Sequence, residues 1–276
     1  MILQCSPKPT KVKLWSNNSI ECEKLFISTG YYFSKVRKSA ALGGANDSLT
    51  NVRGTIIPHH DLADSMIIDA FRRLKEDNDY EKIIIIGPNH FYPESPTIIS
   101  SYSLKDYPID KIIIEKMENS INDLVLDQEK LENEHSVGIP IKYLNQIYPN
   151  ATFVPIAVSP FYTNEILNQI VQVLSAEVSD NALYVLSVDF AHNVGVDEGL
   201  KNNEVSIDAI RNFDMDKILT FNDKYLDSPV ALVLFLKIME NFGAKNWTTL
   251  YSTHGSIIEG EPDLNGTSYV VGTFSN

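Results

Sequence analysis

Four of the six histidines of this 276-residue chain follow apolar runs that are typical of β-strands. The runs, with the polar residues that follow them, are 54–58 before His59 and His60, 83–88 before His90, and 183–188 before Asp189 and His192. Because the carboxyl ends of the strands in an open α/β sheet form the crevice where ligands bind, we expect these side chains to converge. Imidazole is the commonest metal ligand and titrates near neutral pH. The pattern therefore predicts a shared polar or metal site.

Each of these residues also has an ordinary structural explanation. Adjacent residues at a strand end point in opposite directions, so at most one of His59 and His60 is expected to face a shared centre, and the alternative is a pair in a surface turn. His90 lies in a sharp turn and belongs either to a functional loop or to an ordinary one. If the chain enters a helical turn after residue 188, Asp189 and His192 share a face, and the carboxylate can orient the imidazole. Otherwise Asp189 caps the next segment.

The remaining histidines and the absent motifs narrow the chemistry. Glu134-His135-Ser136 precedes a predicted helix, for which Ser136 is a candidate cap, and His254 follows a late strand. Dinucleotide-binding, Walker, zinc-protease and nucleophile-elbow signatures are absent from the sequence. Two or three histidines with a carboxylate and open coordination positions suit a redox metal such as Fe(II), or zinc.

Strand-like and helix-like segments alternate along the chain, which predicts βαβ units. Four isoleucines in a row at 83–86 indicate a strand buried on both faces. Expected strands are 54–58, 82–86, 97–101, 152–158, 182–188, 247–252 and 268–274, and expected helices are 61–77, 109–121, 136–148, 166–178, 198–219 and 229–242. We therefore expect a single α/β domain with a central, largely parallel sheet flanked by helices. Residues 51–276 form this domain, and residues 1–50 are an N-terminal segment along its edge.

Composition limits the partners and the compartment. A net charge of −13 and a pI near 4.9 argue against binding to nucleic acid or to anionic membranes, which requires a basic face. Cys5 and Cys22 alone cannot build a disulfide framework or a four-thiolate zinc site, which favours a reducing, cytoplasmic home. No window approaches the ~20 apolar residues of a membrane span.

Four short segments, in this order, resemble those of the Memo family, whose microbial members are called AmmeMemoRadiSam system protein B. They are Ile57-Pro58-His59-His60, Ile86-Gly87-Pro88-Asn89-His90, Glu134-His135-Ser136 and Ser187-Val188-Asp189-Phe190-Ala191-His192, and Thr267-Ser268-Tyr269-Val270-Val271-Gly272 is similar as well. The family is similar in fold to the class III extradiol (LigB-like) dioxygenases, which are non-haem iron enzymes. The resemblance therefore implies a LigB-like dioxygenase fold.

By this resemblance, His59 and His90 take the positions of the family's metal-binding histidines, and His192 and Asp189 fall where further site residues lie. The family often has a ligating cysteine in a CGxxP segment, whereas the corresponding stretch here is Tyr225-Leu226-Asp227-Ser228-Pro229. Three alternatives follow from this departure. Asp227 could substitute as an oxygen ligand, His192 could complete the set, or the site could hold metal weakly.

The leading hypothesis is a metal-binding Memo-family protein with non-haem, dioxygenase-like oxidoreductase activity on an unknown small molecule or peptide. His59, His90 and His192 would bind a divalent metal, with Fe(II) favoured and Zn or Cu as alternatives. Asp189 would orient His192, and His60 or His135 would move a proton. The main alternative is a non-catalytic module that captures a peptide or a small anion in the same crevice, and a metal hydrolase is a third. Family neighbours also imply association with radical-SAM and AMMECR-type proteins.

Overall fold

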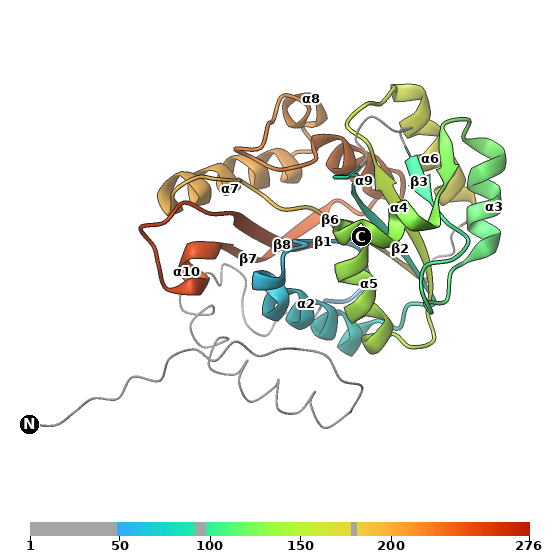
Figure 1. Ribbon diagram of the computed structural model, residues 1–276, viewed down its shortest axis with the longest axis horizontal. Coiled ribbons are helices and arrows are strands. Elements are labelled where there is room, and N and C mark those ends of the chain that lie inside the picture. The colour runs from blue at the N-terminus through green and yellow to red at the C-terminus, as the bar shows by residue number, and fades with distance from the viewer. Residues whose placement is uncertain (1–48, 92–97, 178–180) are drawn as a thin grey trace, which may run out of the picture.

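One mixed sheet forms the centre of the protein (Figure 1). The computed structural model describes residues 49–91, 98–177 and 181–276. Within these residues, the strands form an eight-stranded sheet in the order β4-β3-β5-β2-β6-β1-β8-β7. The strands are β1 (Val52–Ile57), β2 (Lys82–Pro88), β3 (Ile98–Ser100), β4 (Leu124–Leu126), β5 (Thr152–Val158), β6 (Ala182–Ser187), β7 (Asn246–His254) and β8 (Ser268–Ser275).

The middle of the sheet is parallel, as the alternation of strands and helices predicts. β5 pairs with β2, β2 with β6 and β6 with β1, all in parallel, so the carboxyl ends of these four strands lie at one edge. The last strands differ from a βαβ pattern because β8 runs antiparallel to both β1 and β7. The predicted single α/β domain with a largely parallel central sheet is thus confirmed, with antiparallel strands added at its sides.

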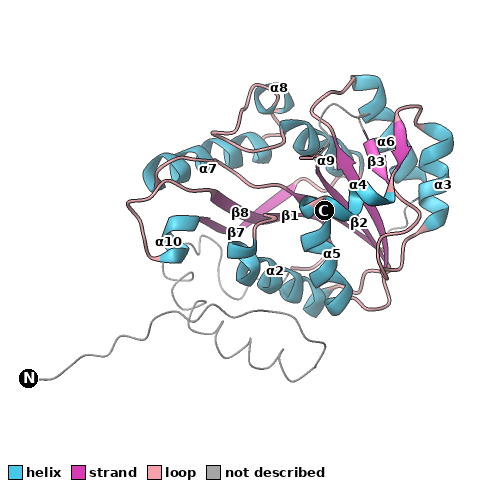
Figure 2. Cartoon of the chain, viewed as in Figure 1, coloured by secondary structure: helices cyan, strands magenta, loops and turns pink. Residues whose placement is uncertain are grey.

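Helices cover both faces of the sheet (Figure 2). They are η1 (Asp61–Ala63), α2 (Asp64–Asp77), α3 (Lys111–Ser120), α4 (Gln128–Asn133), α5 (His135–Ile147), α6 (Asn164–Glu177), α7 (Val196–Arg211), α8 (Met215–Ile218), α9 (Pro229–Asn241) and α10 (Gly255–Glu259). The helical stretch expected over 198–219 is divided into α7 and α8. Phe213, which lies between them, adopts a left-handed φ of 52°, a conformation that an α-helix cannot contain.

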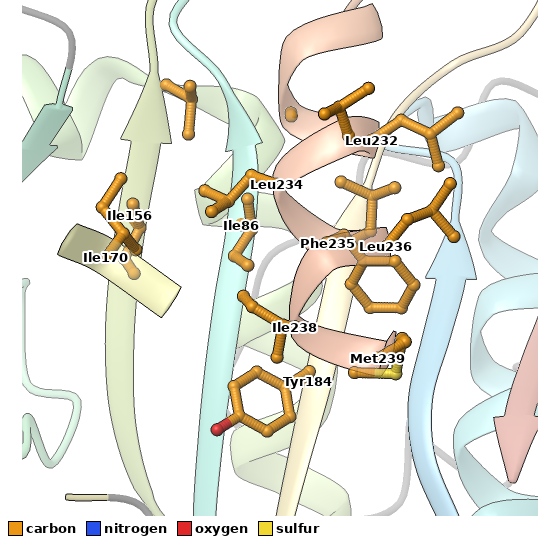
Figure 3. Close-up of a cluster of buried hydrophobic side chains, with 14 of the residues drawn as sticks. Ile86, Ile156, Ile170, Tyr184, Leu232, Leu234, Phe235, Leu236, Ile238 and Met239 are labelled. Carbon is orange, nitrogen blue, oxygen red and sulfur yellow. The ribbon is translucent and has the colours of Figure 1, made fainter. Parts of the chain in front are cut away.

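The isoleucine run of β2 packs against the helices on both faces of the sheet. Ile84 and Ile86 pack into a core cluster with α6 and α9, and Figure 3 shows Ile86 beside Leu234 and Ile238 of α9. Ile83 and Ile85 point to the opposite face and pack with α2 and α5. Successive side chains of a strand alternate between faces, so an unbroken apolar run is what a strand covered on both sides requires.

Two expectations about the chain as a whole have different outcomes. The predicted edge segment 1–50 lies almost entirely outside the described residues. None of the helices in the part of the chain that the structure describes combines the length and the apolar content that crossing a membrane requires.

Candidate metal centre

Three histidines meet at the edge formed by the carboxyl ends of the parallel strands. His59 follows β1, His90 follows β2, and His135 is the first residue of α5. One ring nitrogen from each lies within 4.8 Å of the others. The ring centroids are 5.0 Å apart for His59 and His90, 4.9 Å for His59 and His135, and 4.4 Å for His90 and His135. Three neutral imidazoles at this spacing can hold a metal ion.

The start of α5 is fixed against β2, and this contact brings His135 to the site. The carboxylate of Glu134 caps the helix by accepting from the backbone N–H of Ser136 at 3.0 Å. The Ser136 hydroxyl donates to the carbonyl of Pro88 at 2.7 Å. A Cβ at Gly87 would lie only 2.4 Å from this hydroxyl oxygen, so the close approach of helix and strand requires glycine there.

Hydrogen bonds to the backbone and to the ring position the other two histidines. Glu134 accepts from the backbone N–H of His90 at 2.7 Å and lies 2.9 Å from its Nδ1, which leaves Nε2 of His90 facing the site. The backbone N–H of His59 donates to Asp189 Oδ1 at 3.0 Å, and Nδ1 of His59 lies 3.4 Å from the Ser187 hydroxyl. The contact of Glu134 with Nδ1 of His90 is of the kind that fixes the tautomer and the orientation of a ligating histidine.

Asp227 brings a third buried carboxylate to the same place, beside Glu134 and Asp189. Its Oδ2 lies 3.1 Å from Nε2 of His59 and 3.6 Å from Nε2 of His90. Several contacts tie the segment before α9 to the segment after β6, among them a backbone hydrogen bond from His192 to Asp223 at 2.7 Å. The backbone N–H of Asp227 donates to the carbonyl of Asp189 at 3.1 Å, the N–H of Asp189 donates to Oδ2 of Asp227 at 3.2 Å, and Phe190 forms an antiparallel bridge with Leu226.

The histidines of the site differ in their electrostatics. Burial alone would lower the pKa of His90, but hydrogen bonds with Asp227 and Glu134 outweigh it and raise that pKa to about 9. Burial would likewise lower the pKa of His59, but the charges of Asp189 and Asp227 raise it above its ordinary value. For His135, burial and the two neighbouring imidazoles act together and lower the pKa to about 4. His135 is therefore the imidazole that stays neutral.

The carboxyl groups also differ. Burial opposes ionisation of Asp227, but the His59 and His90 imidazoles outweigh it and hold the pKa of its carboxyl well below the usual range. Burial similarly opposes ionisation of Glu134, whose pKa the contacts with His90 and Ser136 lower. At Asp189, burial prevails over the attraction of His59 and raises the pKa. Asp227 and Glu134 thus remain anionic beside the imidazoles.

The other predicted site residues take different positions. His192 is not part of the three-histidine group, and its buried Nε2 has no hydrogen-bond partner among the residues that the structure describes. The helical turn that would have placed Asp189 and His192 on one face does not form, because Phe190 bridges Leu226 in an extended segment. Asp189 accepts from the backbone N–H of His59, and the nearby His192 imidazole also opposes the rise in the pKa of Asp189. The group of three neighbouring histidines thus contains His135, whereas the sequence hypothesis placed His192 beside His59 and His90.

His60 turns away from this group, as the alternation of side chains at a strand end predicts for one member of the pair. Its Nδ1 accepts from the backbone N–H of Leu62 at 3.2 Å and caps η1, and its ring lies 5.9 Å from that of Tyr269. Its role in moving a proton stays a prediction.

The sequence alone did not identify His135 as a possible metal ligand and left the role of Asp227 open. His135 follows a short helix rather than a strand, so the strand-end pattern could not identify it as a possible ligand, although the EHS resemblance marked the segment. Asp227 was one of three alternatives. Its position depends on a long-range pairing, the bridge between Phe190 and Leu226, that leaves no local signal in the sequence.

The fold and the site together define an α/β protein with a cluster of three histidines, able to hold a metal ion, at the carboxyl ends of its parallel strands. A family model described as "Memo-like protein" matches residues 33–269. The chain belongs to the Memo-like family.

Named relatives agree with this assignment. A "MEMO1 family protein" from Aquifex aeolicus is 28% identical over 222 residues, which cover 72% of this chain and 58% of the relative. A second from Caldivirga maquilingensis is 27% identical over 154 residues, covering 51% and 53% respectively. The chain thus spans little more than half the length of these curated relatives.

The fold is also similar to that of a solved structure. The crystal structure of uncharacterized protein JW3007 from Escherichia coli K12 superposes with a TM-score of 0.54 at 12% sequence identity. The alignment covers 80% of this chain and 99% of that chain. At this identity the likeness concerns the fold alone.

Proposed function

We propose that this protein is a metal-dependent oxidoreductase whose ion is bound at the pocket of His59, His90 and His135. The observation that carries the proposal is the convergence of three imidazoles, with ligand atoms within 4.8 Å of one another, from three separate segments. A coordinated Fe(II), when bound, would supply the capacity to bind and reduce dioxygen. Fe(II) is the proposed metal, and Zn and Cu are the alternatives.

The donor set of the pocket fits a divalent cation. Imidazole nitrogens and carboxylate oxygens are both ordinary ligands of Fe(II) and Zn. In addition, Oδ1 of Asp227 is buried and has no hydrogen-bond partner within the described residues. A buried carboxylate oxygen without a partner is unfavourable, and a cation in the pocket would compensate it. The third ligand, beside His59 and His90, is then either His135 or Asp227.

The chain's own groups would position the substrate and move its proton. His135 is 43% exposed at its side chain, and its lowered pKa keeps it neutral, so it can accept a proton from a group that enters the pocket. Glu134 holds the orientation of His90 through Nδ1. Phe91, which is 55% exposed and lies edge-on 5.7 Å from the His135 ring, places an apolar side chain beside the three histidines.

Metal content tests the first part of the proposal. The purified protein, incubated anaerobically with Fe(II) and desalted, is expected to retain one metal ion per chain in elemental mass spectrometry. The double variant His59→Ala/His90→Ala is expected to retain none, whereas the control His60→Ala, which alters the outward-facing neighbour, keeps its ion. Equal metal content in the wild type and the double variant would refute the ligand assignment.

Oxygen uptake tests the oxidoreductase activity. In the Fe(II)-loaded protein, a catechol-like or peptide compound is expected to accelerate oxygen consumption, and His59→Ala/His90→Ala is expected to abolish the increase.

A non-catalytic binding module is the second candidate. It is favoured by His90, whose pKa of about 9 makes it a cation at neutral pH with a side chain 28% exposed, suited to a small anion. Ligand binding that persists fully in the presence of a chelator would support the module and contradict the metal-dependent enzyme.

We propose a location and partners from the composition and the family resemblance. The scarcity of cysteine supports a cytoplasmic location. The Memo family resemblance supports cooperation with radical-SAM and AMMECR-type proteins, and the acidic net charge of −13 supports partners other than nucleic acid and anionic membranes.

A further inference from the structure

One buried carboxylate lies between the two imidazoles that are best oriented to bind an ion. Both His59 and His90 present Nε2 to Oδ2 of Asp227, at 3.1 and 3.6 Å. We propose that Asp227 is a metal ligand, and that His59, His90 and Asp227 form a set of two histidines and one carboxylate, with His135 beside the ion but not bound to it. This inference rests on the proposed function, because it assumes that the pocket binds metal.

The distances suit ligands of a shared ion. Ligand bonds to Zn are about 2.0–2.2 Å for imidazole nitrogen and carboxylate oxygen. Two such ligands at an angle between a right angle and a tetrahedral angle are therefore separated by about 2.8–3.6 Å. The separations of Asp227 Oδ2 from the two Nε2 atoms, 3.1 and 3.6 Å, match this range. The carboxylate needs little movement to coordinate.

Asp227 is held in place by the backbone rather than by a flexible surface loop. The backbone N–H of Asp227 and that of Asp189 each donate across the two segments, and the Asp227 side chain is only 8% exposed. The ion pairs that the structure shows for Asp227 are with histidines. Its other oxygen, Oδ1, has no hydrogen-bond partner among the described residues, so one acceptor remains for an ion or for a second coordination bond.

The orientation of His135 separates it from this set. Its ring is stacked on that of His90 with an interplanar angle of 21°. An imidazole donates its lone pair in the plane of the ring, so the lone pairs of two nearly parallel stacked rings run side by side and do not converge on one point. The rings of His59 and His90, by contrast, cross at 77°. His135 is thus free to act on a bound molecule.

The consequence is a site with a charged ligand and open coordination positions. A set of two histidines and one carboxylate is typical of non-haem Fe(II) oxygenases, which bind substrate and oxygen at the positions left free. A set of three neutral histidines would carry no negative charge. The identity of the third ligand therefore determines both the charge of the centre and its preference for a divalent cation.

Co(II) binding to the full chain distinguishes the two sets. We expect Asp227→Asn to lower the association constant for Co(II) more than about 100-fold. Removal of a group that only orients a ligand lowers metal affinity by roughly 10–100-fold. His135→Ala should change it less than about threefold, as should the control Asp61→Asn, which removes an exposed carboxylate at the start of η1. In Asp227→Cys, a thiolate at this position should give a sulfur-to-Co(II) charge-transfer absorption band.

The outcomes separate the inference from the proposed function. Loss of Co(II) binding in His135→Ala, with binding retained in Asp227→Asn, would overturn the inference and leave the three-histidine site in place. Absence of the charge-transfer band in Asp227→Cys would also overturn it, and this readout remains decisive if Asp227→Asn folds poorly. A wild-type chain that binds no Co(II) or Fe(II) would instead contradict the proposed function itself.

Discussion

Glu134→Ala tests how one carboxylate holds the pocket together. In the wild type, Glu134 accepts from the backbone N–H of Ser136, accepts from the backbone N–H of His90, and orients the His90 ring through Nδ1. Alanine removes all three contacts at a side chain that is only 2% exposed. The variant should therefore lose both stability and metal affinity.

The magnitude follows from the contacts. Loss of the helix cap costs about 1 kcal/mol. The N–H of His90, left without its acceptor in a partly buried place, adds about 1–2 kcal/mol. We therefore expect the free energy of unfolding to fall by about 2–3 kcal/mol. Loss of the group that orients His90 should also weaken metal binding roughly 10–100-fold.

Urea denaturation and Co(II) titration measure the two effects on the same protein. Glu129→Gln provides the control, because Glu129 is an exposed residue of the neighbouring α4, and it should change stability by less than about 0.5 kcal/mol. Glu134→Gln, which keeps one acceptor oxygen, should fall between the wild type and Glu134→Ala. If Glu134→Ala unfolds like the control and binds Co(II) as tightly as the wild type, the argument that this carboxylate builds the pocket is wrong.

Two further perturbations address the packing of Gly87 against Ser136 and the buried His254. Gly87→Ala should destabilise the protein by about 1–3 kcal/mol and weaken metal binding, because its Cβ would lie 2.4 Å from the Ser136 hydroxyl oxygen, whereas Gly138→Ala, with open space at that position, should be neutral or stabilising in urea denaturation. Equal effects of the two substitutions would contradict the proposed close approach. His254 uses both ring nitrogens on backbone groups, and burial lowers its pKa, so its contribution to stability should be present above pH 6.5 and disappear as the pH falls from there toward its lowered folded-state pKa. The loss of stability between pH 8 and pH 5.5 should be smaller in His254→Asn than in the wild type, and identical pH profiles would refute this assignment.

The fold was predictable because its signals are local. The run of isoleucines at 83–86 indicates a strand covered on both faces, and the structure places Ile83 and Ile85 in one core cluster and Ile84 and Ile86 in the other. The antiparallel pairing of β8 was not predictable in the same way. An apolar strand has the same local pattern whether its neighbour runs parallel or antiparallel. The sequence of β8 therefore does not indicate the direction of its pairing.

The site was predictable only in part, for a related reason. His59 and His90 follow strands whose ends share one edge, and that rule brings them together correctly. His192 also follows a strand, but the segment after β6 is extended and bridged to Leu226, which a rule based on spacing cannot anticipate. His135 reaches the pocket through the contact of Ser136 with β2, which is specified by tertiary packing and not by periodicity.

The donors of the pocket come from both layers that cover the sheet. His135 begins α5, which packs on one face, whereas Asp227 lies just before α9, which packs on the other. During synthesis, a chain that ends before residue 227 would carry all three imidazoles of the group without the carboxylate, and without the β8 strand that pairs with β1. The complete set of side chains at the site is thus a property of the finished domain, and no fragment from one side of the sheet would reproduce it.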